Sequence, residues 1–432
     1  MPQAELDEAF RFAIEERLDA ELLREPSQLA KRCGAFLQID EVCLDPAFGE
    51  EPKRLARVGA FLDAEYLDFH EPCGRYVALS EQVAARRGTA VERESLAESD
   101  DPKFSPAWWV RGPHAQTLWS QFFRRRLAPA LREERLTTPD GDHLYLYHHD
   151  LGVGRPRVLL LHGLEGSSNS HYVSGIVSKA ARRGWSTTVL VFRGCGPELN
   201  SAPRMYHSGE TTDLRFVVDL LIDRAPRDRL FLTGVSLGGN VVLKFLGEAA
   251  SRTPSQIRAA AAVSVPYDLE AGCRALQQGF ARMYDRHFLK SLRRKALRKL
   301  AQHPDLFDLE KLTAARTIED FDDAVTGPIH GFTGSHDYYT RSSSIAFLAP
   351  IHVPTLLLSA EDDPFLPRSV LKKVRDIARA NPKLQVHFTE AGGHVGFLGG
   401  HIPFRPVYWG EERIMAFFDS QSEEPPDASA VS

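Results

Sequence analysis

Short segments that are almost wholly apolar alternate with longer segments in which apolar residues recur every three or four positions. The short segments fit buried β-strands, and the longer ones fit amphipathic helices. Strands that are apolar throughout, in alternation with helices, predict an α/β fold with a mainly parallel central sheet covered on both faces. Six such strands are predicted, within RVLLLHG, STTVLVF, RLFLTGVS, AAAVSVP, VPTLLLSAED and LQVHFTEAG.

Two features add to this repeating pattern. Before the first buried strand, EERLTTPDGDHLYLYHHD holds two strand-like arms around Asp140-Gly141-Asp142, which predicts a hairpin. Between AVSVPYDLE and VPTLLLSAED, at about 269–350, the chain is helical in character and has no clear strand. Connections of this length are usually functional, so we expect a helical insertion that caps a binding site.

The two ends of the chain differ from this α/β region, which spans 99–420. Residues 1–98 contain apolar residues at helical spacing, as in ELDEAFRFAIEERLDAELL, and predict a mainly helical region of unknown role. One hypothesis is that these helices bind a partner or pair two subunits. Residues 421–432 are polar and contain Pro and Ser, which predicts a disordered tail.

Composition excludes several classes of protein. The chain has 432 residues, 43% hydrophobic and 26% charged, and its net charge of −5 does not favour nucleic-acid binding. Its five cysteines are scattered without a CxxC pair, so neither a disulfide framework nor a zinc site is expected. The N-terminus is too acidic for a signal peptide, and no apolar run approaches the roughly 18 residues that cross a bilayer. A cytoplasmic location is therefore expected.

A candidate nucleophile lies in Gly234-Val235-Ser236-Leu237-Gly238. This Gly-x-Ser-x-Gly pattern follows the strand RLFLTGVS and precedes the helix-like GGNVVLKFLGEAA. A sharp strand-to-helix turn needs residues without a Cβ beside the nucleophile, and it lifts the serine hydroxyl clear of the sheet. The alternative is a purely structural serine in a βα turn.

A candidate base and acid follow later in the chain. His394 lies in the glycine-rich loop TEAGGHVGFLGG after the last predicted strand, whereas His387 lies inside that strand and fits a packing or surface role. Three adjacent carboxylates end the preceding strand. Asp363 is favoured as the acid, Asp362 competes with it and Glu361 is a weaker candidate. The order serine, acid, histidine is that of the α/β-hydrolase arrangement.

Two backbone amides are candidates for an oxyanion hole. Leu164 follows an early strand in VLLLHGLEGSSNSHY, and Leu237 follows the candidate nucleophile. Their N–H groups are expected to stabilise a developing oxyanion. His162 fits a role in holding this loop in shape rather than in proton transfer. Phosphate-binding glycine motifs and metal-ligand spacings are both missing, so no cofactor and no metal is expected.

Several polar segments have both a structural and a functional interpretation. Arg193, His207 and Glu210 follow a strand and fit loop-stabilising hydrogen bonds better than a catalytic role. Cys195 has no base and acid placed beside it, so a free thiol is expected. The segment HFLKSLRRKALRKL (287–300) is a basic amphipathic helix. A cap helix with a solvated face is the simpler interpretation, and contact with an anionic membrane surface is the alternative.

The segments from about Pro102 to Phe418 resemble those of YheT-like α/β-hydrolases, a group that includes eukaryotic α/β-hydrolase-domain lipid hydrolases. The resemblance implies carboxylic-ester hydrolysis by Ser236, Asp363 and His394 without a metal, and a lipid or other fatty acyl ester as substrate. Eukaryotic relatives commonly carry an N-terminal membrane anchor, which is not expected here. The resemblance rests on RGPHAQTLWSQFFRR, LLHGLEGSSNSHY, FRGCGPELN, YHSGETTDL, GVSLGGNVVLKFLGE, DDAVTGPIHGF, DYY, DDPFLP and GGHVGFL.

These observations favour a serine esterase that cleaves a small-molecule acyl ester through an acyl-enzyme. Ser236 attacks the carbonyl, His394 accepts its proton and Asp363 orients that histidine. Two alternatives stay open. An acyltransferase would pass the same acyl group to an alcohol or amine, and a non-catalytic protein would retain the fold for binding.

Overall fold

A computed structural model describes residues 103–124 and 128–422. The helical region predicted at 1–98 lies outside the described residues, as does all but the start of the tail predicted at 421–432. The described residues from Phe104 onward belong to one compact unit. In the described part of the chain, no helix is both long and apolar enough to cross a membrane.

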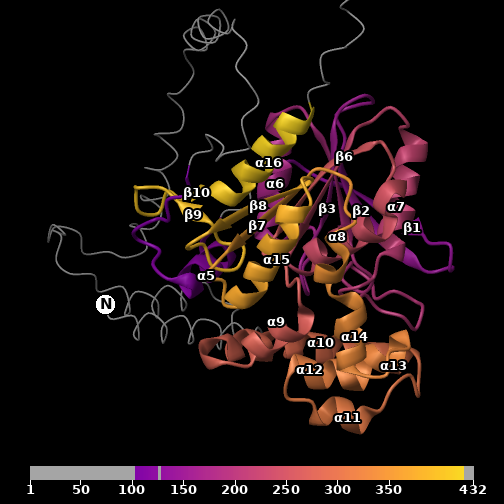
Figure 1. Ribbon diagram of the computed structural model, residues 1–432. Coiled ribbons are helices and arrows are strands. Elements are labelled where there is room, and N and C mark those ends of the chain that lie inside the picture. The colour runs from indigo at the N-terminus through magenta and orange to yellow at the C-terminus, as the bar shows by residue number, and fades with distance from the viewer. Residues whose placement is uncertain (1–102, 125–127, 423–432) are drawn as a thin grey trace, which may run out of the picture. The chain divides into compact units, whose positions relative to one another are not determined.

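An eight-stranded sheet in the order β1-β2-β4-β3-β5-β6-β7-β8 forms the centre of this unit (Figure 1). Strands β3 to β8 are parallel, β1 pairs with β2 as the predicted antiparallel hairpin, and β2 joins β4 antiparallel. The predicted fold class is therefore confirmed. The strands are β1 (Arg132–Thr137), β2 (His143–His149), β3 (Arg157–Leu161), β4 (Ser186–Val191), β5 (Leu230–Val235), β6 (Ile257–Val263), β7 (Thr355–Ala360) and β8 (Leu384–Thr389).

Helices cover both faces of the sheet because its central strands are apolar on both sides. Every residue of β4, β5 and β7 is buried. One core cluster joins the sheet to α7 (Thr212–Arg224), α8 (Leu237–Ala249) and α15 (Arg368–Ala380). The other joins it to α6 (His171–Arg182) and α16 (Trp409–Ser422).

A helical insertion separates β6 from β7, where the long connection was predicted. It packs at one end of the sheet (Figure 1). A further helix, α5 (Pro113–Phe123), and a short ribbon of β9 (Leu398–Gly399) and β10 (Val407–Tyr408) lie together at one side of the sheet. The insertion contains α9 (Leu269–Leu276), α10 (Arg282–Gln302), α11 (Leu309–Ala314), α12 (Ile318–Phe321), α13 (Gly327–His330) and α14 (Ser335–Ser342).

Candidate active site

Ser236 lies on a sharp turn between β5 and α8. Its backbone has φ 54° and ψ −119°, which is a strained conformation for a residue with a side chain. A Cβ added to Gly234 would lie 2.3 Å from the carbonyl oxygen of Gly238, and one added to Gly238 would lie 2.5 Å from that of His162. Both glycines are therefore sterically required, for the reason that the sequence pattern indicated.

The structure brings Ser236, His394 and Asp363 together. His394 Nε2 lies 3.0 Å from Ser236 Oγ, and its Nδ1 lies 2.9 Å from Asp363 Oδ2. An ionised carboxylate can only accept a hydrogen bond, so Nδ1–H donates to Asp363. This tautomer leaves Nε2 free to accept the hydroxyl proton of Ser236. The Asp363 side chain is fully buried, which keeps water from competing for this contact.

The three carboxylates after β7 point to different partners. Asp363 faces His394, and its other oxygen accepts a hydrogen bond from the Phe365 amide at 2.8 Å. Asp362 accepts a hydrogen bond from the Gly393 amide at 2.8 Å, and burial raises the pKa of its carboxyl. Glu361 pairs with Arg375 at 2.6 Å. Of the three candidates, only Asp363 contacts the histidine side chain in these hydrogen bonds.

The loop that carries His394 is braced by residues from distant parts of the chain. Thr117 Oγ1 of α5 accepts a hydrogen bond from the His394 amide at 2.9 Å, and Ser264 Oγ accepts one from the Val395 amide at 3.0 Å. No local pattern points to Thr117, because it precedes the histidine by 277 residues. The only signal was the segment RGPHAQTLWSQFFRR within the family resemblance.

The loop after β3, which carries Leu164, passes close to Ser236. A Cβ added to Gly163 would lie 3.3 Å from Ser236 Cβ, so this loop passes close to the nucleophile. The flanking amides are occupied: that of Gly163 donates to Tyr172 Oη and that of Glu165 to Tyr206 Oη, both at 2.9 Å. Leu237 is the first residue of α8, where backbone N–H groups have no partner within the helix.

The buried His162 side chain holds this loop through hydrogen bonds. It is fully buried, its Nδ1 lies 2.8 Å from the Gly163 carbonyl oxygen, and its Nε2 accepts a hydrogen bond from the Phe192 amide at 3.2 Å. Burial lowers its pKa to about 4, so the ring is neutral near pH 7. These contacts agree with the structural role that the sequence favoured.

Glu165 connects the same loop to the helical insertion. Its carboxylate accepts hydrogen bonds from Tyr206 Oη at 2.7 Å, from Ser291 Oγ at 2.5 Å and from Lys295 Nζ at 2.5 Å. Burial favours its neutral form, but Lys295 and the hydrogen bonds outweigh this and lower its pKa below the usual 4.5. The backbone φ of Glu165 is 54°. The sequence did not mark this role, because Ser291 and Lys295 lie on α10, 126 and 130 residues later.

We expect Glu165→Gln to destabilise the protein by about 3 kcal/mol near pH 7, because it leaves the Lys295 ammonium partly buried without its counter-charge. The folded-state pKa of Glu165 is depressed, so its contribution is present above about pH 4.5 and is lost as the pH falls through the lower folded value. Urea unfolding of the wild type and variant between pH 3 and pH 8 measures both effects.

A matched control for this prediction is the pair of variants Lys295→Met and Glu165→Gln/Lys295→Met. The double variant removes both buried partners and should recover part of the loss seen in either single variant. A Glu165→Gln loss that was unchanged from pH 8 to pH 3 would contradict the ionic contribution.

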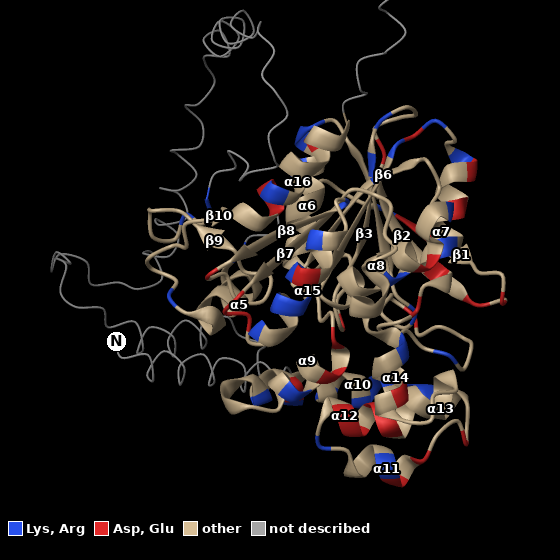
Figure 2. Ribbon diagram, in the orientation of Figure 1, with Lys and Arg blue, Asp and Glu red and all other residues tan. Residues whose placement is uncertain are grey.

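The basic helix predicted at 287–300 forms most of α10. Three of the six basic side chains in this segment bind groups of the protein. Lys295 pairs with Glu165, and Lys299 is fully buried and donates to the carbonyl oxygens of Asn200 and Ala202. Arg293 donates to the Ala315 carbonyl oxygen. Lys290, Arg294 and Arg298 are exposed. Contact of this helix with a membrane therefore stays a hypothesis that rests on fewer charges than its sequence suggests. The Lys and Arg positions of the molecule are marked in Figure 2.

The polar residues after β4 hold loops together. Arg193 is buried and donates to both oxygens of Asp213 at 2.8 Å. The Glu210 carboxylate accepts a hydrogen bond from the first amide of α7 at 2.7 Å. The His207 ring lies 4.4 Å from that of His330 on α13, and burial lowers the pKa of His207 to about 3. These contacts fit the structural interpretation of the three residues.

Cys195 and His387 also lack the contacts of a catalytic residue. The Cys195 thiol lies 3.1 Å from Lys295 Nζ, and burial raises its pKa, which disfavours the reactive thiolate. The His387 ring, within β8, packs 5.0 Å from that of Trp409 and lies beside Arg413.

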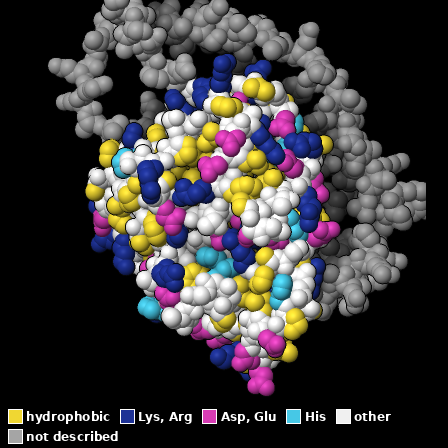
Figure 3. Space-filling model, turned by 90° about the vertical axis from the view of Figure 1, so that its right-hand side faces the viewer, with side chains coloured by type: hydrophobic (Ala, Val, Ile, Leu, Met, Phe, Trp, Pro, Cys, Tyr) yellow, Lys and Arg dark blue, Asp and Glu magenta, His cyan; other side chains and the backbone are white. Residues whose placement is uncertain are grey.

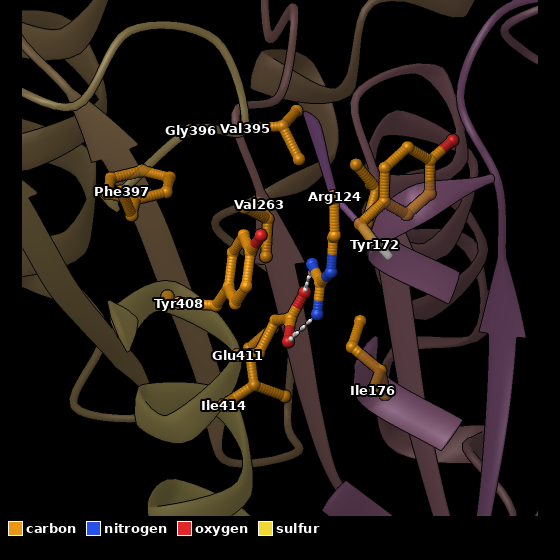
Figure 4. A pocket seen from close by; sticks show the side chains of 12 residues that line it. Arg124, Tyr172, Ile176, Val263, Val395, Gly396, Phe397, Tyr408, Glu411 and Ile414 are labelled. Atoms are coloured by element: carbon orange, nitrogen blue, oxygen red, sulfur yellow. Dashed lines mark hydrogen bonds and ion pairs between the residues drawn. The ribbon is translucent and has the colours of Figure 1, made fainter. Parts of the chain in front are cut away.

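A small cavity lies beside the candidate site (Figure 4). Its lining includes Val235 and Val395, the neighbours of the serine and the histidine in the sequence. Arg124 and Glu411 also line it and form a two-pronged ion pair, with the Arg124 guanidinium 3.6 Å from the centre of the Tyr408 ring. The volume of about 20 Å³ fits about one water molecule.

An aromatic chain connects the histidine to the insertion. The Phe365 ring stacks on His394 with its centre 4.1 Å away, and Tyr284 of α10 contacts Phe365 at 4.9 Å. Phe280 and His114 of α5 extend this contact, with ring centres 4.3 Å apart. In the described residues, no group of three His, Cys, Asp or Glu side chains is arranged to hold a metal ion.

Known proteins match this chain over most of the described unit. A family model described as "alpha/beta hydrolase fold" matches residues 156–400. The protein named "Putative esterase YheT" of Escherichia coli (strain K12) is 38% identical over 321 residues, 73% of this chain and 93% of that protein. "Phospholipase ABHD3" of Mus musculus is 30% identical over 71% of this chain and 75% of that protein. "Monoacylglycerol lipase" of Saccharomyces cerevisiae is 33% identical over 56% of this chain and 55% of that protein.

Proposed function

Because the chain belongs to the α/β-hydrolase family, in its YheT-like group, and is a carboxylic ester hydrolase of the esterase/lipase type, we propose that it cleaves acyl esters through an acyl-enzyme on Ser236. The observation that carries this proposal is the hydrogen-bonded series Ser236, His394 and Asp363, with spacings of 3.0 and 2.9 Å. Nucleophile, base and orienting acid within hydrogen-bond distance are what serine acyl transfer requires.

In the first half-reaction Ser236 Oγ attacks the ester carbonyl carbon while its proton passes to His394 Nε2. The buried Asp363 stabilises the imidazolium that forms. The amides of Leu164 and Leu237 donate to the oxyanion of the tetrahedral intermediate. His394 then protonates the leaving alcohol as the C–O bond breaks, and an ester between the acyl group and Ser236 remains.

In the second half-reaction water replaces the alcohol. His394 Nε2 accepts a proton from the water, whose oxygen attacks the acyl-enzyme carbonyl. Collapse of the second intermediate releases the carboxylic acid, and His394 returns the proton to Ser236 Oγ. The serine is regenerated, and the net reaction converts one ester and one water into a carboxylic acid and an alcohol.

The substrate class that we propose is a lipid or medium-chain acyl ester. The aromatic series from Phe365 through Tyr284 to Phe280 supports it, because it offers an apolar wall between the histidine and the insertion. The names of the mouse and yeast relatives include a phospholipase and a monoacylglycerol lipase. The insertion at about 269–350 would then select the acyl chain.

A fluorophosphonate probe is expected to label Ser236 in the folded protein, because the probe traps an activated serine as a tetrahedral phosphonyl ester. Mass spectrometry of the peptide that contains TGVSLGG would locate the adduct. Heat-denatured protein is the control, since a denatured serine has no base. A folded protein that hydrolysed no ester and resisted the probe would favour the non-catalytic binding protein.

The acyltransferase alternative differs only in what resolves the acyl-enzyme. Incubating the protein with one acyl ester and a competing alcohol separates the two reactions by their products. Free acid as the main product supports hydrolysis, and a new ester as the main product supports acyl transfer.

A further inference from the structure

Exposed apolar side chains gather where α5 meets the β9–β10 ribbon. Phe404 is 69% exposed, Ile402 59% and Phe123 58%. Trp108 and Val407 are 56% and 51% exposed. Single exposed apolar residues are ordinary, but a group of large ones marks a surface that binds something. We call these five residues the apolar surface.

The apolar surface is held in a fixed shape. The indole N–H of Trp108 donates to the His401 carbonyl oxygen at 3.0 Å, which ties the segment before α5 to the loop after β9. The Trp119 ring of α5 packs against two phenylalanines of the apolar surface, with ring centres 5.8 Å from Phe404 and 4.5 Å from Phe123. These contacts join two segments that are distant in the sequence into one surface.

The two segments that form the apolar surface carry basic side chains but no acidic ones. Residues 103–124 and 391–410 contain Lys103, Arg111, Arg124 and Arg405 but no Asp or Glu, in a chain whose net charge is −5. Arg124 pairs inward with Glu411. Lys103, Arg111 and Arg405 are exposed.

The face over β1 and α7 is different, because side chains of both signs are mixed there (Figure 3). Many of these charges pair, as in Arg132 with Asp150 and Arg224 with Glu134. Within residues 103–124 and 391–410, by contrast, every Lys, Arg, Asp or Glu side chain is basic, which suits an anionic partner.

The apolar surface and the candidate active site share one helix. The inner side of α5 carries Thr117, which accepts the hydrogen bond from the His394 amide, and Gln116, which binds the Leu398 amide at 2.8 Å. The outer side carries Phe123. Anything that docks on the apolar surface is thus close to the loop that holds the histidine.

We propose that the apolar surface docks the protein on a lipid–water interface that contains anionic phospholipid. Tryptophan and phenylalanine side chains partition to the headgroup level of a bilayer, and exposed Lys and Arg beside them are attracted to anionic lipids. Docking itself requires no catalytic activity. Its consequence, delivery of acyl esters to Ser236, rests on the function proposed above.

Pairing of two copies through the apolar surface, and membrane binding through α10, both fit the contacts and charges less well. A second copy of the chain would bring Arg111 and Arg405 against a surface whose two segments have no carboxylate, and like charges oppose such pairing. The segment 287–300 of α10 was the membrane-binding candidate from the sequence, but three of its six basic side chains bind groups of the protein.

The test is sedimentation of the full chain with vesicles of phosphatidylcholine alone or with one-third phosphatidylglycerol. The wild type should bind the anionic vesicles more tightly. The variant Phe123→Ser/Ile402→Ser/Phe404→Ser should lose about tenfold or more in partitioning, since three apolar side chains no longer enter the interface. Its hydrolysis of a soluble short-chain ester should stay within about twofold of the wild type, because these side chains face solvent.

The matched control is Lys290→Gln/Arg294→Gln/Arg298→Gln on α10, which should bind vesicles within about threefold of the wild type. Equal binding by the wild type and the serine variant, or loss of binding in the α10 variant alone, would overturn the proposal. So would a wild-type dimer that ignores vesicles and becomes monomeric in the serine variant. Ser236→Ala should sediment like the wild type, so failed catalysis and failed docking are distinguishable.

Discussion

Ser236→Ala is expected to lower kcat for a short-chain ester by about 10⁵–10⁶-fold, with little change in stability. Removing a serine nucleophile costs about this much in serine hydrolases, and the residual rate reflects the oxyanion hole and binding alone. The alanine retains the Cβ, so the strained backbone at φ 54° is no worse than with serine. Initial rates with a chromogenic acyl ester, together with thermal unfolding, measure both quantities.

The matched control is Ser251→Ala, an exposed serine just beyond the C-terminal end of α8. It should keep wild-type rates, because it contacts none of the proposed catalytic groups. Full ester hydrolysis by a folded Ser236→Ala protein would mean that another residue is the nucleophile. Cys195 would then be tested next, although burial raises its pKa.

Local patterns predicted most of the sheet because parallel central strands are apolar throughout. All six segments chosen for that reason form strands, and Asp140-Gly141-Asp142 forms the predicted turn. The parallel direction of these strands also brings Ser236, Asp363 and His394 together. All three lie in turns or loops that follow parallel strands, and such loops meet at one edge of the sheet. Their catalytic roles and the helices in residues 1–98 stay predictions.

The supports of the site could not be predicted from local patterns. Thr117 and Glu165 act through contacts with residues more than 100 positions away, and no periodicity reports such pairs. Lys299 is a further residue whose surroundings the local pattern does not predict. A helical pattern counts it as a solvent-facing charge, but carbonyl oxygens of a loop accept its hydrogen bonds in the interior.

Neighbouring carboxylates pose a further problem for sequence reasoning. Asp362 and Asp363 differ by one position, and their side chains diverge because the loop turns between them. One meets the Gly393 amide and the other meets the His394 ring. The choice depends on loop conformation, which composition does not encode.

Asp363→Asn is therefore expected to lower kcat by about 10⁴-fold, whereas Asp362→Asn should stay within about fivefold of the wild type. An asparagine NH₂ facing Nδ1 favours the tautomer with its proton on Nε2. That nitrogen could no longer accept the proton of Ser236. At position 362 the amide oxygen of asparagine can still accept the hydrogen bond from Gly393.

The comparison of the two variants decides which carboxylate orients the histidine, because they are adjacent and isosteric with the wild type. Both are assayed with the same soluble ester and with the fluorophosphonate probe, whose labelling rate reports activation of Ser236 directly. A large loss in Asp362→Asn with normal labelling in Asp363→Asn would assign the role to Asp362. Equal losses in both would show that the loop conformation matters more than the charge facing Nδ1.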